Sequence, residues 1–440
     1  MPDVCLPWGQ QELKVSLPEH WTLQRVACAD LKPAVAQWPE RLAAALNQPA
    51  TGPSLDKLLA ARRNGRIVLV IEDVTRHSPV EQILEVLMRE FCHARIDDAQ
   101  LEVLFATGMH PPMTPQQAQM KLGALANRIR WRSNPWHDSQ AYVRVGTAGR
   151  LDVFVDRALA AADLRIIVSS VTPHLQAGFG GGYKMFIPGC SSIETIRGLH
   201  RLGLGRTAKQ LVGTEAMANP MRTAIDIGGQ LVDAAFGKTL AVQYVLDHRD
   251  LPAHVVVGEP IPTQRMLAKQ CAVSCGIIPP APADVLITNA YPRDFDLWQS
   301  FKGIANTLWA AKPNGLVICM TRCLSGANGM APPRWPLSPA WTRRMLGLVG
   351  PESLSSLVMR LVPKLGGDAA FFVRMAAQMC HRNPIFIVSE TLHDAGMLFP
   401  GIHIFRDPKD AIAAADKMLH AKPQRVTVFP SGGITFPVPI

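Results

Sequence analysis

The chain has 440 residues, a length that allows two or more domains with substantial cores. Its 48% of hydrophobic and 18% of charged residues are typical of a globular protein. Its net charge of +10 is spread without long runs of like charge, which excludes a nucleic-acid-binding tail and leaves a weak preference for anionic ligands. Because we find no signal peptide, no uninterrupted apolar stretch of about 18 residues, and nine cysteines without repeated spacing, we expect a cytoplasmic protein that binds neither membranes nor nucleic acids.

Three apolar runs in the first half predict buried strands. They cover residues 66–72 (RIVLVIE), 101–106 (LEVLFA) and 164–170 (LRIIVSS). Helical segments alternate with these runs, which is the order of elements in α/β proteins. We therefore expect a mainly parallel sheet flanked by helices.

Capping patterns predict where two of the intervening helices begin. Ser78 stands before Pro79, so we expect Ser78 to be the N-cap and Pro79 the first helical residue. The sequence TPQQ at 114–117 contains a cap, a proline and the glutamine of a capping box. Both helices would follow a predicted strand and its loop.

A third helix is predicted to begin near Ser192, because SSIE at 191–194 matches a capping box. On this helix Ile193, Ile196 and His200 are spaced by three and four residues and share one face. We therefore expect His200 to point inward.

The second half repeats the α/β pattern and is expected to form a second domain with a mainly parallel sheet. We predict strands at 284–289, 316–321, 385–390, 402–405 and 425–429, helices over 294–311 and from Asp407-Pro408 onward, and a proline-rich loop at 327–339. No GxGxxG motif follows the first of these strands, so no dinucleotide site is predicted. We divide the chain into residues 1–275 and 276–440, with a final segment that could pack back on the first domain.

Polar, titratable residues follow the predicted strands of the first half. Asp73 and Arg76 come after the first strand, His110 after the second and His174 after the third. The ligand crevice of an open α/β sheet lies outside the carboxyl ends of its strands. Three separate loops would therefore bring titratable groups to one edge.

A glycine-rich loop precedes Lys184 in the segment PHLQAGFGGGYK, residues 173–184. Glycine permits tight backbone conformations and leaves room for a bulky group to approach. Lys184 is either a surface lysine or a desolvated amine that acts as a nucleophile and covalent anchor.

The histidines each have a structural and a chemical interpretation. His200 is either a core histidine bonded to a backbone carbonyl or a metal ligand, and no HExxH or paired CxxC motif supplies further protein ligands. His110 and His174 could cap helices or fill loops, or they could act together as an acid/base pair.

Three further residues suggest recognition of an anion. Arg76 either pairs with Asp73 or holds a carboxylate or phosphate with its forked donors. Gln299 and Lys302 share a helix face that is either solvated or reaches an anionic substrate.

At these residues the chain resembles the nickel-dependent lactate racemase family. The shared motifs are spread over most of the chain: DVTR at 73–76, ATGMHPP at 106–112, PHLQAGFGGGYK at 173–184, PGCSSIET at 188–195 with His200, and WQSFKG at 298–303. Each motif alone is modest, but together in this order they are specific. The family has two α/β domains with the active site in the cleft between them.

The resemblance implies a cofactor and roles for the residues. The family's nickel-pincer nucleotide, a pyridinium mononucleotide with sulfur-bearing arms, would be bonded to Lys184 through a thioamide, and His200 would be the protein ligand to nickel. His110 and His174 would be the catalytic acid/base pair. The other predicted contacts are Asp73, Thr75, Arg76, Gly181 and Gly182 to the cofactor, and Arg76, Trp298, Gln299 and Lys302 to the substrate.

The implied reaction is the racemisation or epimerisation of a 2-hydroxy acid by proton-coupled hydride transfer, through a transient 2-keto acid. Partners would be the small-molecule substrate and the proteins that build the cofactor, and a homo-oligomer is compatible with the sequence. Where the lactate enzyme has a tyrosine before the glutamine, this chain has Trp298, which puts lactate itself in doubt. Two alternatives remain open: a metal-free enzyme in which Lys184 forms a Schiff base, and a non-catalytic binder of a phosphorylated metabolite.

Overall fold

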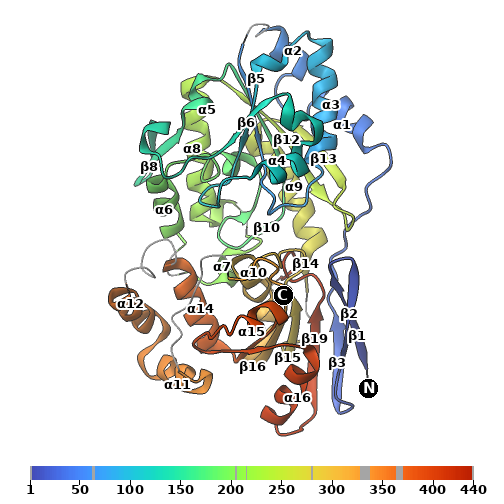
Figure 1. Ribbon diagram of the computed structural model, residues 1–440, viewed down its shortest axis with the longest axis vertical. Coiled ribbons are helices and arrows are strands. Elements are labelled where there is room, and N and C mark those ends of the chain that lie inside the picture. Colours follow the sequence, from blue (N-terminus) through green and yellow to red (C-terminus); the bar gives the residue numbers. More distant parts are fainter. Residues whose placement is uncertain are drawn as a thin grey trace. The chain divides into compact units, whose positions relative to one another are not determined.

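Figure 1 shows the computed structural model, which describes residues 2–61, 65–203, 206–214, 216–278, 281–327, 337–362 and 370–438. Contacts divide the chain into two compact units, which are treated separately below. The N-terminal unit consists of residues 31–203 and 214–274. The C-terminal unit consists of residues 275–440 together with 1–30 and 204–213.

The sheet of the N-terminal unit has six strands in the order β13-β12-β9-β4-β5-β6. All neighbouring pairs are parallel except β12 and β13, so the predicted mainly parallel sheet is confirmed. The strands are β4 (Ile67–Ile71), β5 (Leu101–Phe105), β6 (Arg130–Ser133), β9 (Leu164–Ser170), β12 (Thr239–Leu246) and β13 (Pro252–Gly258); outside the sheet lie the hairpins β7 (Tyr142–Ala148) with β8 (Leu151–Asp156) and β10 (Pro173–His174) with β11 (Gly178–Phe179).

The three strands predicted from apolar runs lie side by side in the centre of this sheet. Ile71 at the end of β4 pairs with Phe105 of β5 on one side and with Val168 of β9 on the other. The loops that follow these strands therefore leave the sheet at one edge, as the sequence predicts.

Both faces of the sheet are buried, which explains why its strands are apolar throughout. Alternate residues of β4 enter different cores: Leu69 belongs to one cluster and Val70 to the other. The first cluster joins the sheet to α1 (Trp38–Asn47), α2 (Leu55–Ala60), α3 (Val80–His93) and α4 (Pro115–Leu122), and the second joins it to α5 (Arg157–Ala161), α6 (Ile193–Arg201), α8 (Pro220–Phe236) and the β7–β8 hairpin.

The capping predictions have mixed outcomes. Thr114 and Gln117 form the expected capping box of α4, and the Ser192 side chain caps α6. Ser78, by contrast, does not cap α3, which begins at Val80 after Pro79. The Ser78 hydroxyl instead donates to Glu72 Oε2 at 2.7 Å, where it satisfies a buried carboxylate.

The C-terminal unit contains a second six-stranded sheet, in the order β18-β17-β16-β15-β19-β3, and all its neighbouring strands are parallel. Its strands are β3 (Trp21–Val26), β15 (Ala283–Asn289), β16 (Ala311–Met320), β17 (Ile385–Val388), β18 (Ile402–Phe405) and β19 (Gln424–Phe429), which confirms the five predicted from the sequence. The remaining elements are β1 (Asp3–Trp8), β2 (Gln11–Ser16), α7 (Ala208–Leu211), β14 (Gly276–Ile277), α10 (Leu297–Thr307), α11 (Pro339–Val349), α12 (Pro351–Leu361), α14 (Ala370–Arg382), α15 (Glu390–Asp394), α16 (Pro408–Met418) and β20 (Phe436–Pro437).

The division into units differs from the predicted one at the N-terminus. We expected residues 1–30 in the N-terminal domain, but β3 pairs with β19 and extends the second sheet. Trp21 is buried there in a core with Val426 and Val428, and this packing holds residues 1–30 against the C-terminal sheet. The final strand β20 pairs with β14 of the same C-terminal unit.

Two further predictions concern loops and helix ends of this unit. The predicted helix over 294–311 is shorter, because the Asp296 side chain accepts a hydrogen bond from the Gln299 N–H at 2.8 Å and α10 therefore begins at Leu297. Most of the proline-rich segment 327–339 lies outside the described residues. None of the helices in the described ranges is long and apolar enough to cross a membrane.

Candidate active site

The loop after β4 folds around the Asp73 carboxylate. The Thr75 N–H and hydroxyl both donate to Asp73 Oδ1, the former at 3.0 Å. The Arg76 guanidinium does not form the direct bond to the Asp73 carboxylate that one sequence interpretation predicts; its Nη1 donates to the Thr75 hydroxyl at 2.8 Å. The guanidinium therefore keeps donors for another anion.

Asp73 also binds His110, which comes from the loop after β5. His110 Nδ1 lies 2.6 Å from Asp73 Oδ2, and the histidine side chain is 44% exposed whereas the aspartate is buried. Burial alone would raise the pKa of Asp73, but the charge and hydrogen bond of His110 and the charge of Arg76 hold it well below its usual range. In the neutral ring, His110 Nδ1–H donates a hydrogen bond to the ionised Asp73, which leaves Nε2 as a proton acceptor.

His174 is held in the opposite way. Its Nδ1 accepts the backbone N–H groups of Gln176 at 3.3 Å and Ala177 at 3.1 Å. Because Nδ1 accepts, the proton of the neutral ring is on Nε2. One ring nitrogen of His174 thus fills the loop-stabilising role that the sequence left open.

The glycines of the 178–182 loop are needed by the protein's own packing. Gly181 and Gly182 have φ values of +76° and +62°, which side chains rarely adopt. A Cβ on Gly181 would lie 2.7 Å from Gln243 Oε1, so the space that glycine leaves there is filled by the chain rather than open to a ligand. The room for a bulky group that the sequence suggested is absent at this position.

Lys184 follows the loop in a 3-10 turn, Gly182–Met185, with a side chain that is largely withdrawn from solvent. Burial, reinforced by the positive charges of Arg76 and Arg222, lowers the pKa of Lys184 to about 7. A large fraction of the amine is therefore unprotonated at neutral pH, the state in which an amine is nucleophilic. This matches the desolvated alternative and not the surface lysine.

His200 lies in the last turn of α6 and is partly buried, beside the buried Ile196. Its backbone carbonyl accepts from Gln176 Nε2 at 3.4 Å, which ties α6 to the loop of His174. Within the residues that the structure describes, no cluster of three or more His, Cys, Asp and Glu side chains is arranged to bind a metal.

Trp298, Gln299 and Lys302 lie on α10 of the C-terminal unit. Gln299 is buried and its Oε1 accepts from Lys302 Nζ at 2.5 Å, so this face is not simply solvated. The partly exposed Trp298 ring packs edge-on against Phe372 of α14, with 4.0 Å between ring centroids. Trp298 and Phe372 thus form an aromatic surface, and Lys302 lies one turn further along α10.

Two buried charged residues near the DVTR loop were missed by the sequence analysis. Glu72 accepts four hydrogen bonds, two from Ser170 and one each from Ser78 and Tyr244. Lys121 donates to the carbonyls of Arg76 and Ser78, and burial lowers its pKa to about 8. The only sequence signal was the position of Glu72 directly before Asp73.

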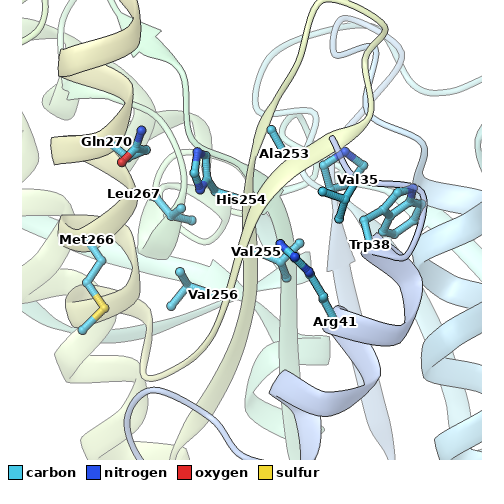
Figure 2. A pocket seen from close by; sticks show the side chains of 11 residues that line it. Val35, Trp38, Arg41, Ala253, His254, Val255, Val256, Met266, Leu267 and Gln270 are labelled. Carbon is cyan, nitrogen blue, oxygen red and sulfur yellow. The ribbon is translucent and has the colours of Figure 1, made fainter. Parts of the chain in front are cut away.

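A pocket elsewhere in the N-terminal unit contains none of the predicted site residues. Figure 2 shows it at the edge strand β13, between α1 and α9 (Pro260–Cys275). Side chains of β13 point alternately toward the two helices, with His254 facing α9 and Val255 facing α1. The pocket is therefore a feature of the sheet edge and not of the loops that carry the histidines.

Comparisons with known proteins agree with the motifs. A family model of the lactate racemase N-terminal domain matches residues 8–211. The lactate racemase of Thermoanaerobacterium thermosaccharolyticum is 25% identical over 345 residues, which cover 76% of this chain and 78% of the relative. The lactate racemase of Lactiplantibacillus plantarum is 25% identical over 296 residues, 66% of this chain and 67% of the relative.

Solved structures share the fold. The lactate racemase apoprotein from T. thermosaccharolyticum superposes with a TM-score of 0.81 at 19% identity, over 100% of both chains. A protein from Thermotoga maritima gives a TM-score of 0.66 at 17% identity, over 94% of this chain and 100% of its own. Residues 8–211 therefore match the lactate racemase N-terminal domain, and the chain as a whole is similar to lactate racemases, which are isomerases, in sequence and in fold.

Proposed function

We propose that this protein racemises or epimerises a 2-hydroxy acid through a transient 2-keto acid, with a nickel-pincer nucleotide bonded to Lys184. The observation that carries the proposal is the pair of histidines held in opposite tautomers, His110 by a carboxylate and His174 by backbone amides. One ring offers a lone pair and the other an N–H, which is what proton transfer at two faces of a carbinol carbon requires.

The residues present fit such a cofactor. The amine of Lys184, with its pKa lowered to about 7, is suited to bond an acyl-type carbon. Arg76 has donors available for an anionic group, and the imidazole of His200 is a suitable nickel ligand. When bound, the nickel nucleotide would supply the acceptor for the hydrogen that leaves the substrate carbon with its electron pair.

The proton transfers would belong to the histidines. The α-hydrogen of a 2-hydroxy carboxylate is barely acidic, because the neighbouring carboxylate is already anionic, so its loss as a hydride is easier than its loss as a proton. As the hydride leaves, His110 Nε2 would take the hydroxyl proton, and the ionised Asp73 would stabilise the imidazolium. Return of the hydride to the other face would then be accompanied by donation of the His174 Nε2 proton to the oxygen. His174 would take a proton from solvent and His110 would release the one it holds, which restores both rings.

Binding of the substrate carboxylate would fall to cations. Arg76 is the predicted contact in the N-terminal unit, and Lys302, Gln299 and Trp298 are the predicted contacts on α10. Anchoring the carboxylate would keep the reacting carbon in attack geometry. With Trp298 in place of the tyrosine, we propose a 2-hydroxy acid as the substrate class and not lactate in particular.

The covalent link gives a direct test. The protein is produced together with nickel and the proteins that build the cofactor, and its intact mass and the peptide containing Lys184 are measured. An adduct on Lys184, absent from a Lys184→Arg control, supports the proposal. An unmodified lysine in a preparation that racemises hydroxy acids contradicts it.

The lowered pKa of Lys184 also favours a second candidate, a metal-free enzyme that forms a Schiff base with a carbonyl substrate. Borohydride reduction distinguishes the two, because it traps an imine on the lysine. A substrate-derived mass on Lys184 in nickel-free protein would favour this candidate.

A further inference from the structure

A buried arginine that the sequence analysis did not consider holds the glycine loop from behind. Arg222, on α8, is only 1% exposed. Its guanidinium donates to the carbonyl oxygens of three consecutive loop residues, Phe179, Gly180 at 3.4 Å and Gly181 at 3.3 Å. One planar fork therefore fixes the orientation of successive peptide groups.

The same loop is fixed by two neutral side chains. Gln264 Nε2 donates to the Gly180 carbonyl at 3.0 Å, and Gln243 Oε1 accepts the Gly182 N–H at 2.6 Å. Gly181 and Gly182 thus have their polar groups directed at buried partners, in backbone conformations with positive φ.

The contact chain continues from Arg222 to Lys184. The Gly181 carbonyl that accepts from Arg222 also accepts the backbone N–H of Lys184, at 3.3 Å. A change in the guanidinium position would therefore move the turn that carries the lysine.

The charge of Arg222 is only partly compensated. Its carboxylate partner Asp226 lies 3.7 Å away and also binds Arg265, so one carboxylate serves two guanidinium groups. Unbalanced positive charge in a buried region acts over a longer range than it would in water.

We propose that Arg222 is a positioning residue for Lys184: it fixes the 178–182 loop, presents the amine in one orientation and places a buried positive charge near it. That the positioned amine serves to attach a cofactor rests on the proposed function. The effect of Arg222 on Lys184 itself does not depend on that function. The charged groups that act on the amine are Arg76 and Arg222, which disfavour its protonation, and Asp73 and Glu72, which favour it.

The chain offers a matched control in Arg165, a second fully buried arginine of the same unit. Its guanidinium also donates to four backbone carbonyls, those of Leu159, Ala162, Phe236 and Gly237. It lies at the amino end of β9, however, whereas the glycine loop follows the carboxyl end of that strand. Loss of either arginine removes comparable hydrogen bonds to backbone carbonyls. Arg222 in addition shares the Gly181 carbonyl with the backbone N–H of Lys184.

The first experiment measures how fast an amine-acylating reagent labels Lys184 in cofactor-free protein as a function of pH, read by peptide mass spectrometry. We expect Arg222→Met to move the midpoint upward by about one pH unit, so that labelling at neutral pH is about fivefold slower. Arg165→Met should leave the midpoint unchanged. An unchanged midpoint in Arg222→Met, or an equal shift in Arg165→Met, overturns the proposal.

Arg222→Lys separates charge from geometry and serves if the methionine variant does not fold. It keeps the positive charge but cannot bond three carbonyls at once, so we expect the wild-type midpoint. When Arg222→Lys is produced with nickel and the cofactor-building proteins, the fraction of Lys184 that carries the adduct should be at least about fivefold lower than in the wild type. This corresponds to a free-energy difference smaller than that of a tenfold change. A shifted midpoint or a full adduct yield overturns the proposal. The labelling results hold whether or not the nickel cofactor is used, so they separate failure of this inference from failure of the proposed function.

Discussion

His110 Nδ1 and Asp73 Oδ2 lie 2.6 Å apart, and this contact joins loops that follow two neighbouring strands of the N-terminal sheet. A carboxylate in this position sets the imidazole tautomer and stabilises its protonated form. The Asp73–His110 pair is thus the feature on which proton transfer depends in our account.

Asp73→Asn should leave the fold intact but lower turnover by about 10²–10⁴-fold, the range of a general acid/base contribution. The amide can donate to Nδ1 and so favours the tautomer in which Nε2 carries the proton and cannot act as a base. Steady-state kinetics in both directions measure the loss. Full activity in a variant with normal thermal unfolding would exclude the proposed role.

The amine of Lys184 should make stability depend on pH. Its pKa in the folded protein, about 7, is below the ordinary value of about 10.4 that it regains on unfolding. Between these values the unfolded chain binds more protons, so the contribution of Lys184 to stability rises with pH across this window and is constant below it.

Lys184→Met should therefore raise the melting temperature of the cofactor-free protein at about pH 6, by on the order of 5 °C, and the gain should shrink toward about pH 10. Lys238→Met is the control, because Lys238 is an exposed lysine whose side chain is 69% accessible. Differential scanning fluorimetry over this pH range gives the comparison. Parallel curves for wild type and Lys184→Met would contradict a lysine that is largely neutral in the fold.

Much of the architecture could be predicted because it is encoded locally. The strands β4, β5 and β9 are apolar runs whose residues enter two cores, and their alignment brought Asp73 and His110 together as expected. By contrast, β3 carries no local sign that it joins a sheet whose other strands begin about 260 residues later along the chain.

The buried polar contacts that hold the site residues in place could not be predicted from the sequence. Arg222 is one arginine in an amphipathic helix, and its role arises from a contact with a loop about 40 residues earlier. Ser78 was misassigned for a related reason, since its hydroxyl is used by Glu72 rather than by the helix that follows it. Long-range polar contacts decide both cases, and they leave no periodic pattern.

Nickel retention and covalent attachment should separate in two variants. His200→Ala is expected to lower the nickel content of purified holoenzyme at least about tenfold, the lower range seen when a metal site loses an interaction, while the adduct on Lys184 stays. Lys184→Ala should lose the adduct altogether. Elemental analysis and intact mass measure the two effects, and nickel at the wild-type level in His200→Ala would exclude that residue as a ligand.

Trp298→Tyr is expected to change which hydroxy acids are accepted. The indole packs edge-on against Phe372, and a smaller phenol would open this aromatic surface and add a hydroxyl group. Because the space beside the substrate becomes larger, we expect relative kcat/KM for bulky over short 2-hydroxy acids to rise about tenfold, the lower range that one pocket contact contributes. Phe372→Leu should shift the preference in the same direction, and an unchanged ranking in both variants would remove Trp298 from the substrate contacts.

In the proposed reaction the substrate hydrogen leaves as a hydride and returns to the same carbon. Enantiopure 2-hydroxy acids are incubated with nickel-loaded enzyme in deuterated water, and configuration and deuterium content are followed by optical rotation and proton NMR. We expect inversion of the centre with protium retained at the α-carbon. Inversion with deuterium incorporated at that carbon would show proton abstraction and contradict it.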